Sequence, residues 1–241
     1  MTTAQIAVVT GASRGLGFAL ADALAGAGYD LIIDARDETA LRAAAADLRA
    51  RHGLDERAVL ALPGDITDPR HRDRLVASAA VRGGASLLVN NAGTLGASPL
   101  PPLADYPLDE LRAAFEANVV APIALAQLLL PDLRRLGGAV LNITSDAAVE
   151  PYRGWSGYGA AKAALEQASN VLAAEEPAVR VWRVDPGDLR TQMHQEAFPG
   201  EDISDRPLPE SVAPAFLRLI GERMPSGRYR ATELRPAGAR S

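Results

Sequence analysis

A short apolar run that passes directly into a glycine-rich turn and a helix limits most strongly what this chain can fold into. Residues 5–9 read Gln-Ile-Ala-Val-Val, the β-branched content of a strand buried on both faces. Residues 10–17, Thr-Gly-Ala-Ser-Arg-Gly-Leu-Gly, form what we call the glycine turn, and an Ala- and Leu-rich segment continues to Ala25. Glycines let the backbone approach a pyrophosphate, and a helix N-terminus offers free N–H donors. The segment therefore predicts a dinucleotide phosphate site.

The same alternation of strand and helix continues along the chain. We expect further strands near residues 30–34, 59–62, 87–89, 139–143, 179–184 and 228–232, with helices near 38–51, 69–80, 108–136, 158–174 and 209–222. Such alternation produces a mostly parallel sheet with helices on both faces. We predict an α/β, Rossmann-like, doubly wound fold in a single domain over residues 1–241, with residues 194–209 as a lid and 234–241 as a disordered tail.

Composition excludes several classes of function. The net charge of −5 argues against nucleic acid or an anionic membrane surface as a partner. The absence of cysteine excludes thiolate nucleophiles and zinc–thiolate sites, and we expect no metal site. The longest apolar run, residues 119–130, is shorter than the ~20 residues of a membrane span, and the first is too short for a secretory signal. We expect a cytoplasmic protein whose histidines, His52, His71 and His194, are solvated.

Tyr158 and Lys162 indicate proton-transfer chemistry. They stand four residues apart in an alanine-rich run that favours helix, so both side chains lie on one helical face. Lys162 is the only lysine among 25 basic residues, which suggests that an arginine cannot replace it. A nearby ammonium lowers the pKa of a phenol from ~10 toward the range useful to a general acid–base. Ser145 ends the strand 139–143 and places a hydroxyl at the same sheet edge.

Residues after the second and third strands give a mixed signal about the cofactor. An acid at the end of the second strand bonds the ribose 2′-hydroxyl of NAD, whereas arginine pairs with the 2′-phosphate of NADP. Asp34 and Arg36 are both present there, and Arg14 adds a second positive charge, which favours NADP. Asp65 after the third strand is either a ligand-binding residue or the N-cap of the helix 69–80.

Two asparagine positions also stand out. Asn90 and Asn91 follow the fourth strand and can lock a turn beside the cofactor. Asn118 lies inside the long helix, where asparagine is unfavourable, so it marks either a kink around a bound water or an exposed position.

These motifs resemble the short-chain dehydrogenase/reductase family. The glycine turn, the NNAG at residues 90–93, Asn118, the Ser145/Tyr158/Lys162 set and Pro186-Gly187-x-x-x-Thr191 occur in the family's order. The resemblance implies a catalytic tetrad of Asn118, Ser145, Tyr158 and Lys162. The acid of NAD enzymes falls at Ala35 and the basic residue of NADP enzymes at Arg36. The implied cofactor-binding residues are Gly11, Ser13, Arg14, Gly15, Leu16, Gly17, Arg36, Asp65, Ile66, Asn91, Ala92, Gly93, Tyr158, Lys162, Pro186, Gly187 and Thr191.

Within that family, residues 90–96 and 151–193 resemble the sepiapterin reductases and bacterial benzil reductases. The acid that holds the pterin ring in the former group falls at Ala231, and Glu233 is a candidate replacement on the same strand face. The implied substrate pocket is mostly apolar or aromatic: Leu95, Asp146, Trp155, Asp188, Met193 and Phe198.

The resemblance implies NADPH-dependent reduction of a small ketone or vicinal dicarbonyl to a secondary alcohol. Ser145 would bond the substrate oxygen, Tyr158 would give it a proton, Lys162 would tune Tyr158, and Asn118 would hold a water. The alternatives are a 3-oxoacyl-thioester reductase acting on a carrier protein, an NAD-dependent secondary alcohol dehydrogenase, or a non-catalytic NADP sensor. A homodimer or homotetramer is expected.

Overall fold

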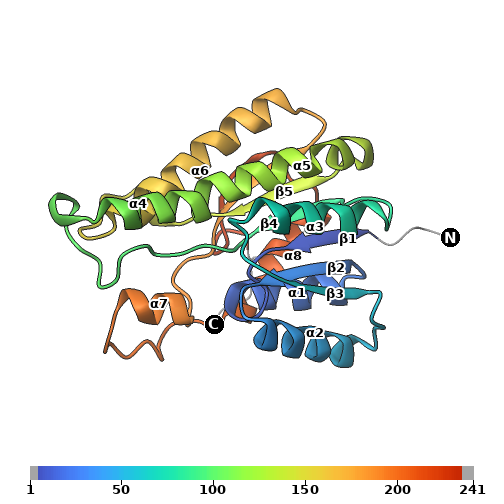
Figure 1. Cartoon of the computed structure of the whole chain (residues 1–241), viewed down its shortest axis with the longest axis horizontal. Helices are drawn as coiled ribbons and strands as arrows, with labels where there is room; N and C mark the ends of the chain where they lie inside the picture. Colours follow the sequence, from blue (N-terminus) through green and yellow to red (C-terminus); the bar gives the residue numbers. More distant parts are fainter. Residues whose placement is uncertain (1–4, 235–241) are drawn as a thin grey trace.

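The computed structural model describes residues 5–234 and contains a seven-stranded parallel sheet (Figure 1). The strand order is β3-β2-β1-β4-β5-β6-β7. The strands are β1 Ile6–Val9, β2 Asp30–Ala35, β3 Val59–Pro63, β4 Leu87–Asn90, β5 Ala139–Ile143, β6 Arg180–Asp185 and β7 Gly227–Arg230. All six strand pairs are parallel, which confirms the doubly wound α/β prediction.

Helices cover both faces of this sheet. They are α1 Gly15–Gly26, α2 Glu38–His52, α3 Pro69–Ala80, α4 Leu108–Phe115, α5 Ala121–Leu136, α6 Ser156–Glu175, α7 Gln192–Ala197 and α8 Ala213–Gly221. In β1, Ala7 and Val9 belong to a core cluster with α1, α2 and α8, while Ile6 and Val8 belong to a second cluster with α3 and α5. Because successive strand residues point to opposite faces, a strand between two helical layers is mostly apolar on both sides.

The sequence-based boundaries hold to within two residues except in three places, and α7 is a helix that the sequence did not predict. The helix predicted over 108–136 contains a π-helical turn, Glu116–Val120, between α4 and α5. The helix predicted over 209–222 divides into a 3₁₀ turn, Pro209–Ser211, and α8. The closing strand ends at Arg230, two residues earlier than expected, so Ala231 follows β7 rather than lying within it.

The end of the chain corrects one further prediction. Leu234 is buried in the larger core cluster, so the predicted disordered tail is wrong at that residue. Residues 235–241 lie outside the described residues.

The helical segment Leu108–Leu136 is long and apolar enough, by length and composition alone, to cross a membrane. The sequence analysis did not identify this, because it considered only the apolar run 119–130. The apolar stripe of the helical segment is used inside the protein, because Leu125, Leu129 and Leu133 are fully buried against the sheet. Core helices of globular domains pass the same length and composition test.

The strand order reverses direction at β1, which has β2 on one side and β4 on the other. In open α/β sheets ligands bind at such a point, outside the carboxyl ends of the strands. The glycine turn follows β1 and the NNAG segment follows β4, so the topology places both motifs there. In Figure 1, α7 and the start of α4 project beyond this edge of the sheet.

Candidate active site

Helix α6 presents a polar stripe to the ends of the central strands. Tyr158, Lys162 and Glu166 follow at intervals of four residues, and all three are buried. Small residues allow this helix to approach closely: a Cβ at Gly159 would lie 2.6 Å from the carbonyl oxygen of Ala147. The predicted pairing of Tyr158 with Lys162 on one face is present, with the ammonium 5.5 Å from the centre of the phenol ring.

Lys162 is held by the strand that leads to Ser145. Its Nζ donates a hydrogen bond to the carbonyl oxygen of Ile143 at 2.8 Å. Burial lowers the pKa of Lys162 to about 8, so this side chain can exchange a proton near neutral pH.

The expected lowering of the Tyr158 pKa is wrong in this structure. Burial raises the pKa of the phenol well above its ordinary value, the carboxylates of Asp185 and Asp146 raise it further, and Ser145 lowers it in part. The sequence argument considered only the charge on the same helix, whereas the opposing carboxylates come from β6 and from the turn after β5. Tyr158 is therefore a protonated phenol at neutral pH.

Ser145 lies in the turn after β5, where its side chain caps a short 3₁₀ helix. Its Oγ donates to Asp146 Oδ1 at 3.0 Å and accepts from the Ala147 N–H at 3.2 Å. Asp146 also accepts from the Tyr152 hydroxyl at 2.9 Å. A carboxylate therefore lies beside the catalytic candidates, and the sequence analysis had assigned it only to the pocket.

Asn118 occupies the π-helical turn and is fully buried, which excludes the exposed alternative. Its Nδ2 donates to the Thr94 carbonyl at 2.8 Å, and its Oδ1 accepts from the Thr94 N–H at 3.0 Å. A Cβ at Gly93 would overlap Asn118 Oδ1 and would lie 3.8 Å from Lys162 Nζ. Asn118 thus lies close to Lys162 and fixes the loop after β4.

Glu166 and Arg228 complete this part of the site, and sequence reasoning missed both. Glu166 accepts from Thr144 Oγ1 at 2.6 Å and from Arg228 Nε at 2.9 Å. Arg228 Nη2 donates to the carbonyl oxygen of Ser145 at 3.2 Å. Together with the Lys162 bond to Ile143, these contacts hold three successive residues, 143–145. The interval of four from Lys162 to Glu166 was the signal available in the sequence.

The glycine turn has the shape of an anion cradle. Gly11 and Gly15 have positive φ values of 67° and 58°, and a Cβ at Gly17 would overlap the Gly11 carbonyl. Within the described residues no side chain caps the first turn of α1, so its N–H groups are available to an anion. A Cβ at Gly15 would lie 3.6 Å from Thr191 Cγ2, so the first and last motifs of the sequence meet here. The residues present fit a dinucleotide.

Asn90 is the last residue of β4 and Asn91 follows it, and of the two only Asn91 locks this turn. Its Nδ2 donates to the carbonyl oxygens of Thr10 and Gly11 at 2.9 and 3.1 Å, while its N–H and that of Ala92 donate to Thr10 Oγ1. Asn90 instead donates to Asn142 at 2.7 Å and ties β4 to β5.

The structure resolves the mixed signal after β2. Asp34 is buried and accepts from the Gly11 N–H at 2.8 Å and from His71 at 3.0 Å, so both carboxylate oxygens are engaged. Arg36 and Arg14 are exposed at the same edge. His71 is 1% exposed, so its predicted solvation is wrong.

The N-cap alternative for Asp65 is also wrong. Asp68 caps α3 by accepting from the Arg70 N–H, and Asp65 bonds Thr67 instead. Asp65 is exposed, and the neighbouring Ile66 is buried against the sheet.

Four of the six predicted pocket residues gather on one side of Tyr158. Leu95, Trp155, Met193 and Phe198 belong to one apolar cluster with Tyr158. We call these four residues, without Tyr158, the aromatic wall. The Trp155 ring centre lies 5.6 Å from that of Tyr158 in an edge-on arrangement and 5.9 Å from that of Phe198. Met193 lies in α7, one residue before the predicted lid, and Phe198 follows α7 within that lid region.

A cavity of about 310 Å³ adjoins this site, and we call it the acidic cavity. Its lining residues are Asp146, Glu150, Tyr152, Asp185, Gly187, Arg230 and Thr232. Asp188 lies apart from it, with a side chain 64% exposed beside His194. Glu233 is exposed and Ala231 is buried, and neither lines the cavity.

Comparison with known proteins gives consistent matches. The short chain dehydrogenase family model matches residues 5–202. The chain is 37% identical over 214 residues to sepiapterin reductase of Meriones unguiculatus, covering 80% of this chain and 77% of the relative. It is 30% identical over 224 residues to the (S)-benzoin-forming benzil reductase IRC24 of Saccharomyces cerevisiae, covering 88% of this chain and 80% of the relative.

Solved structures show the same fold. A short chain dehydrogenase of Escherichia coli CFT073 complexed with NADPH superposes with a TM-score of 0.86 at 29% identity, covering 94% of this chain and 96% of that chain. An alcohol dehydrogenase of Thermococcus sibiricus complexed with 5-hydroxy-NADP gives a TM-score of 0.84 at 27% identity, covering 97% and 99% respectively.

Proposed function

The chain belongs to the short-chain dehydrogenase family, and on that premise we propose that it is an NADPH-dependent carbonyl reductase. Its substrate is a small ketone or vicinal dicarbonyl, and its product is a secondary alcohol. The observation that carries this proposal is the protonated, buried phenol of Tyr158, which lies between the aromatic wall and Ser145. A neutral phenol suits reduction, in which the oxygen of the carbonyl group must gain a proton.

The side chains divide the chemistry between them. Bound NADPH supplies the hydride. Ser145 hydrogen-bonds the carbonyl oxygen of the substrate, and Tyr158 donates its phenolic proton to that oxygen. Lys162, with its pKa lowered to about 8, restores the proton on the phenol. Asn118 keeps the loop after β4 closed against Lys162.

NADP is favoured over NAD by the charges at the end of β2. The 2′-phosphate of NADP is an anion, and the exposed guanidinium groups there, Arg36 and Arg14, suit it. Asp34, the carboxylate that the sequence offered as a partner of a ribose 2′-hydroxyl, is turned into the protein. The NADPH and 5-hydroxy-NADP complexes of the structural relatives support this choice.

The two sides of the site favour a compact substrate. The aromatic wall offers stacking surface for an aryl or heteroaryl group, as in the substrates of the sepiapterin and benzil reductase relatives. Three carboxylates line the adjoining cavity, an arrangement that repels the acidic carrier protein required by a 3-oxoacyl-thioester reductase. A complete proton-transfer set argues against a sensor that never turns over.

A substrate comparison tests the proposal. We expect NADPH oxidation with benzil or sepiapterin to exceed that with an acetoacetyl thioester by at least tenfold in kcat/KM, and NADH to support much slower turnover. A higher kcat/KM with the thioester would contradict this proposal and would support a 3-oxoacyl-thioester reductase. NADPH binding without turnover of any carbonyl would support the sensor.

The remaining expectations stay part of the proposal. We infer one domain and a cytoplasmic enzyme. Exposed apolar side chains on α5 and α6, Leu128 and Val171, suit a homodimer or homotetramer.

A further inference from the structure

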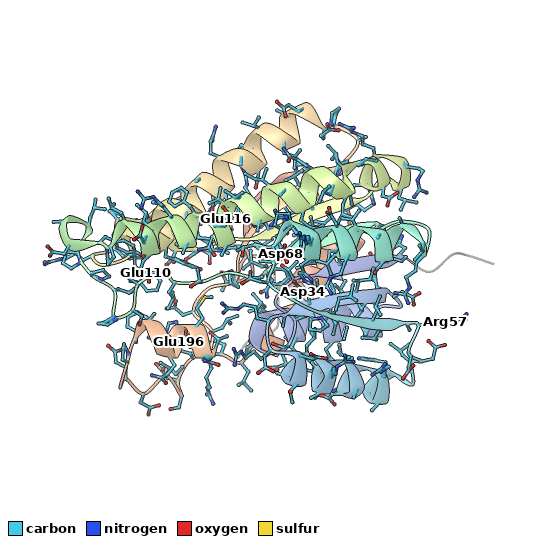
Figure 2. All side chains as sticks on the ribbon, in the orientation of Figure 1. Asp34, Arg57, Asp68, Glu110, Glu116 and Glu196 are labelled. Atoms are coloured by element: carbon cyan, nitrogen blue, oxygen red, sulfur yellow. The ribbon has the colours of Figure 1, made fainter. Side chains whose placement is uncertain are left out.

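A buried pair of titratable side chains lies beneath the glycine turn and takes no part in the chemistry described above. Asp34 is the penultimate residue of β2, and His71 lies in the first turn of α3, with side chains 3% and 1% exposed. The His71 Nε2 atom is 3.0 Å from Asp34 Oδ2. Figure 2 shows Asp34 in the interior near the start of α3, whereas Arg57, Glu110 and Glu196 lie at the periphery.

The neighbours of His71 determine its tautomer. Arg74 Nη2 lies 2.9 Å from Nδ1, and a guanidinium can only donate. Nδ1 is therefore the acceptor, and Nε2 carries the proton that His71 donates to Asp34. A Cβ at Gly64 would overlap this ring, so the residue after β3 must be small for the pair to form.

Asp34 in turn fixes the backbone of the glycine turn. Its Oδ1 accepts from the Gly11 N–H at 2.8 Å, and its backbone carbonyl accepts from the Ala12 N–H at 2.9 Å. Asn91 holds the carbonyl of Gly11 from the other side at 3.1 Å. Gly11 is thus constrained at both its N–H and its C=O while it adopts a positive φ.

We propose that His71 is a positioning residue for cofactor binding: it holds the Asp34 carboxylate in the orientation that pre-organises the glycine turn for a pyrophosphate. This inference rests on the proposed function only in its choice of ligand. A pre-organised turn loses less conformational freedom on binding, which strengthens affinity without a new contact. Without the His71 donor, a buried carboxylate oxygen lacks its partner, and Asp34 must reorient to recover one.

This role has a signature that separates it from ribose recognition. NADPH and NADH share the pyrophosphate, so loosening the glycine turn weakens both by a similar factor. Arg36, in contrast, is the residue proposed above to pair with the 2′-phosphate, so its loss weakens NADPH alone. Neither change alters the proton-transfer side chains.

A matched pair of variants tests the proposal. The amide nitrogen of a glutamine side chain can reach the position of Nε2, whereas the side chain of asparagine is too short to place its nitrogen there. We expect His71→Asn to raise the Kd of both NADPH and NADH about tenfold, measured by fluorescence titration, with kcat at saturating NADPH within twofold of wild type. His71→Gln should restore both affinities to within threefold. Arg36→Ala, the control, should weaken NADPH binding alone.

Amide hydrogen exchange gives a second readout that needs no cofactor. The Gly11 amide should exchange at least tenfold faster in His71→Asn than in His71→Gln, with thermal unfolding confirming that both variants are folded. Equal affinities and equal exchange in the two variants would overturn the proposal, as would a loss confined to NADPH. If the wild type bound neither dinucleotide, the proposed function would fail, and the exchange of Gly11 would still decide the role of His71.

Discussion

Replacing Lys162 with methionine should make the protein more stable and inactive at once. Lys162 is 4% exposed and has a single hydrogen-bond partner among the described residues, the Ile143 carbonyl. Methionine has a similar length and no charge, so the variant removes the cost of burying an ammonium while largely preserving the packing.

The expected gain follows from the pKa of Lys162. Burial lowers this pKa from 10.5 to about 8. At about 1.4 kcal/mol for each tenfold change in proton affinity, the folded state loses about 3.5 kcal/mol at pH 7. The bond to Ile143 has a charged donor, so its loss costs about 1.5 kcal/mol, which leaves a net gain of about 2 kcal/mol. For a chain of this size that gain corresponds to a rise in Tm of about 4–8 °C.

The gain must also depend on pH in one direction. Below the folded pKa of about 8 the wild-type lysine is charged in both states, and its full cost is present. As the pH rises from 8 to 10.5 the folded lysine is neutral while the unfolded one still binds a proton, so wild-type stability recovers. Urea unfolding at pH 7 and pH 10 measures this: the advantage of Lys162→Met should nearly vanish at pH 10. A variant less stable than wild type at pH 7, or an advantage that grows with pH, would refute the reasoning.

Three further predictions follow from the geometry of the site. Arg228→Met should lower kcat about tenfold at unchanged NADPH affinity, because the Ser145 carbonyl and Glu166 lose their partner. The control is Arg134→Met, which breaks a surface ion pair with Glu176. Equal kcat values in the Arg228 and Arg134 variants would contradict the positioning role. Trp155→Ala should raise the KM for a diaryl diketone about tenfold and leave the KM of diacetyl within twofold, since only the aryl group stacks on the aromatic wall. In a single turnover, which needs no reprotonation of Tyr158 by Lys162, carbonyl reduction should keep a constant rate from pH 7 to 9, because burial raises the pKa of the phenol, whereas alcohol oxidation should accelerate with pH; the opposite trend in these single-turnover rates would contradict a protonated donor.

The parts of the molecule that the sequence predicted well depend on local pattern. A strand, a turn and a helix in succession identify the glycine turn because each residue type acts within a few positions of itself. Tyr158 and Lys162 are likewise neighbours on one helix. The strand boundaries agree for the same reason, since fully apolar runs such as β1 are needed wherever helices cover both faces of the sheet.

The errors concern groups that meet only through the fold. His71 and Asp34 are 37 positions apart, and nothing local to His71 indicates that α3 carries it beneath the glycine turn. Arg228 reaches Glu166 across 62 positions. The pKa of Tyr158 moved opposite to expectation because burial and the carboxylates of other elements raise it, and only the bond with Ser145 opposes them. The sequence therefore identified the motifs, but it could not predict the electrostatic effects of residues that are distant in the chain.

The account depends most directly on the proton that Tyr158 gives to the substrate. The decisive measurement is the rate of hydride transfer to a carbonyl substrate in a single turnover by Tyr158→Phe, followed as NADPH oxidation beside a titration of its NADPH affinity. We predict a rate at least 10²-fold below wild type, in line with the usual contribution of a positioned acid, and a Kd for NADPH within about threefold of wild type. A rate close to that of wild type in a variant that binds NADPH normally would contradict the central claim.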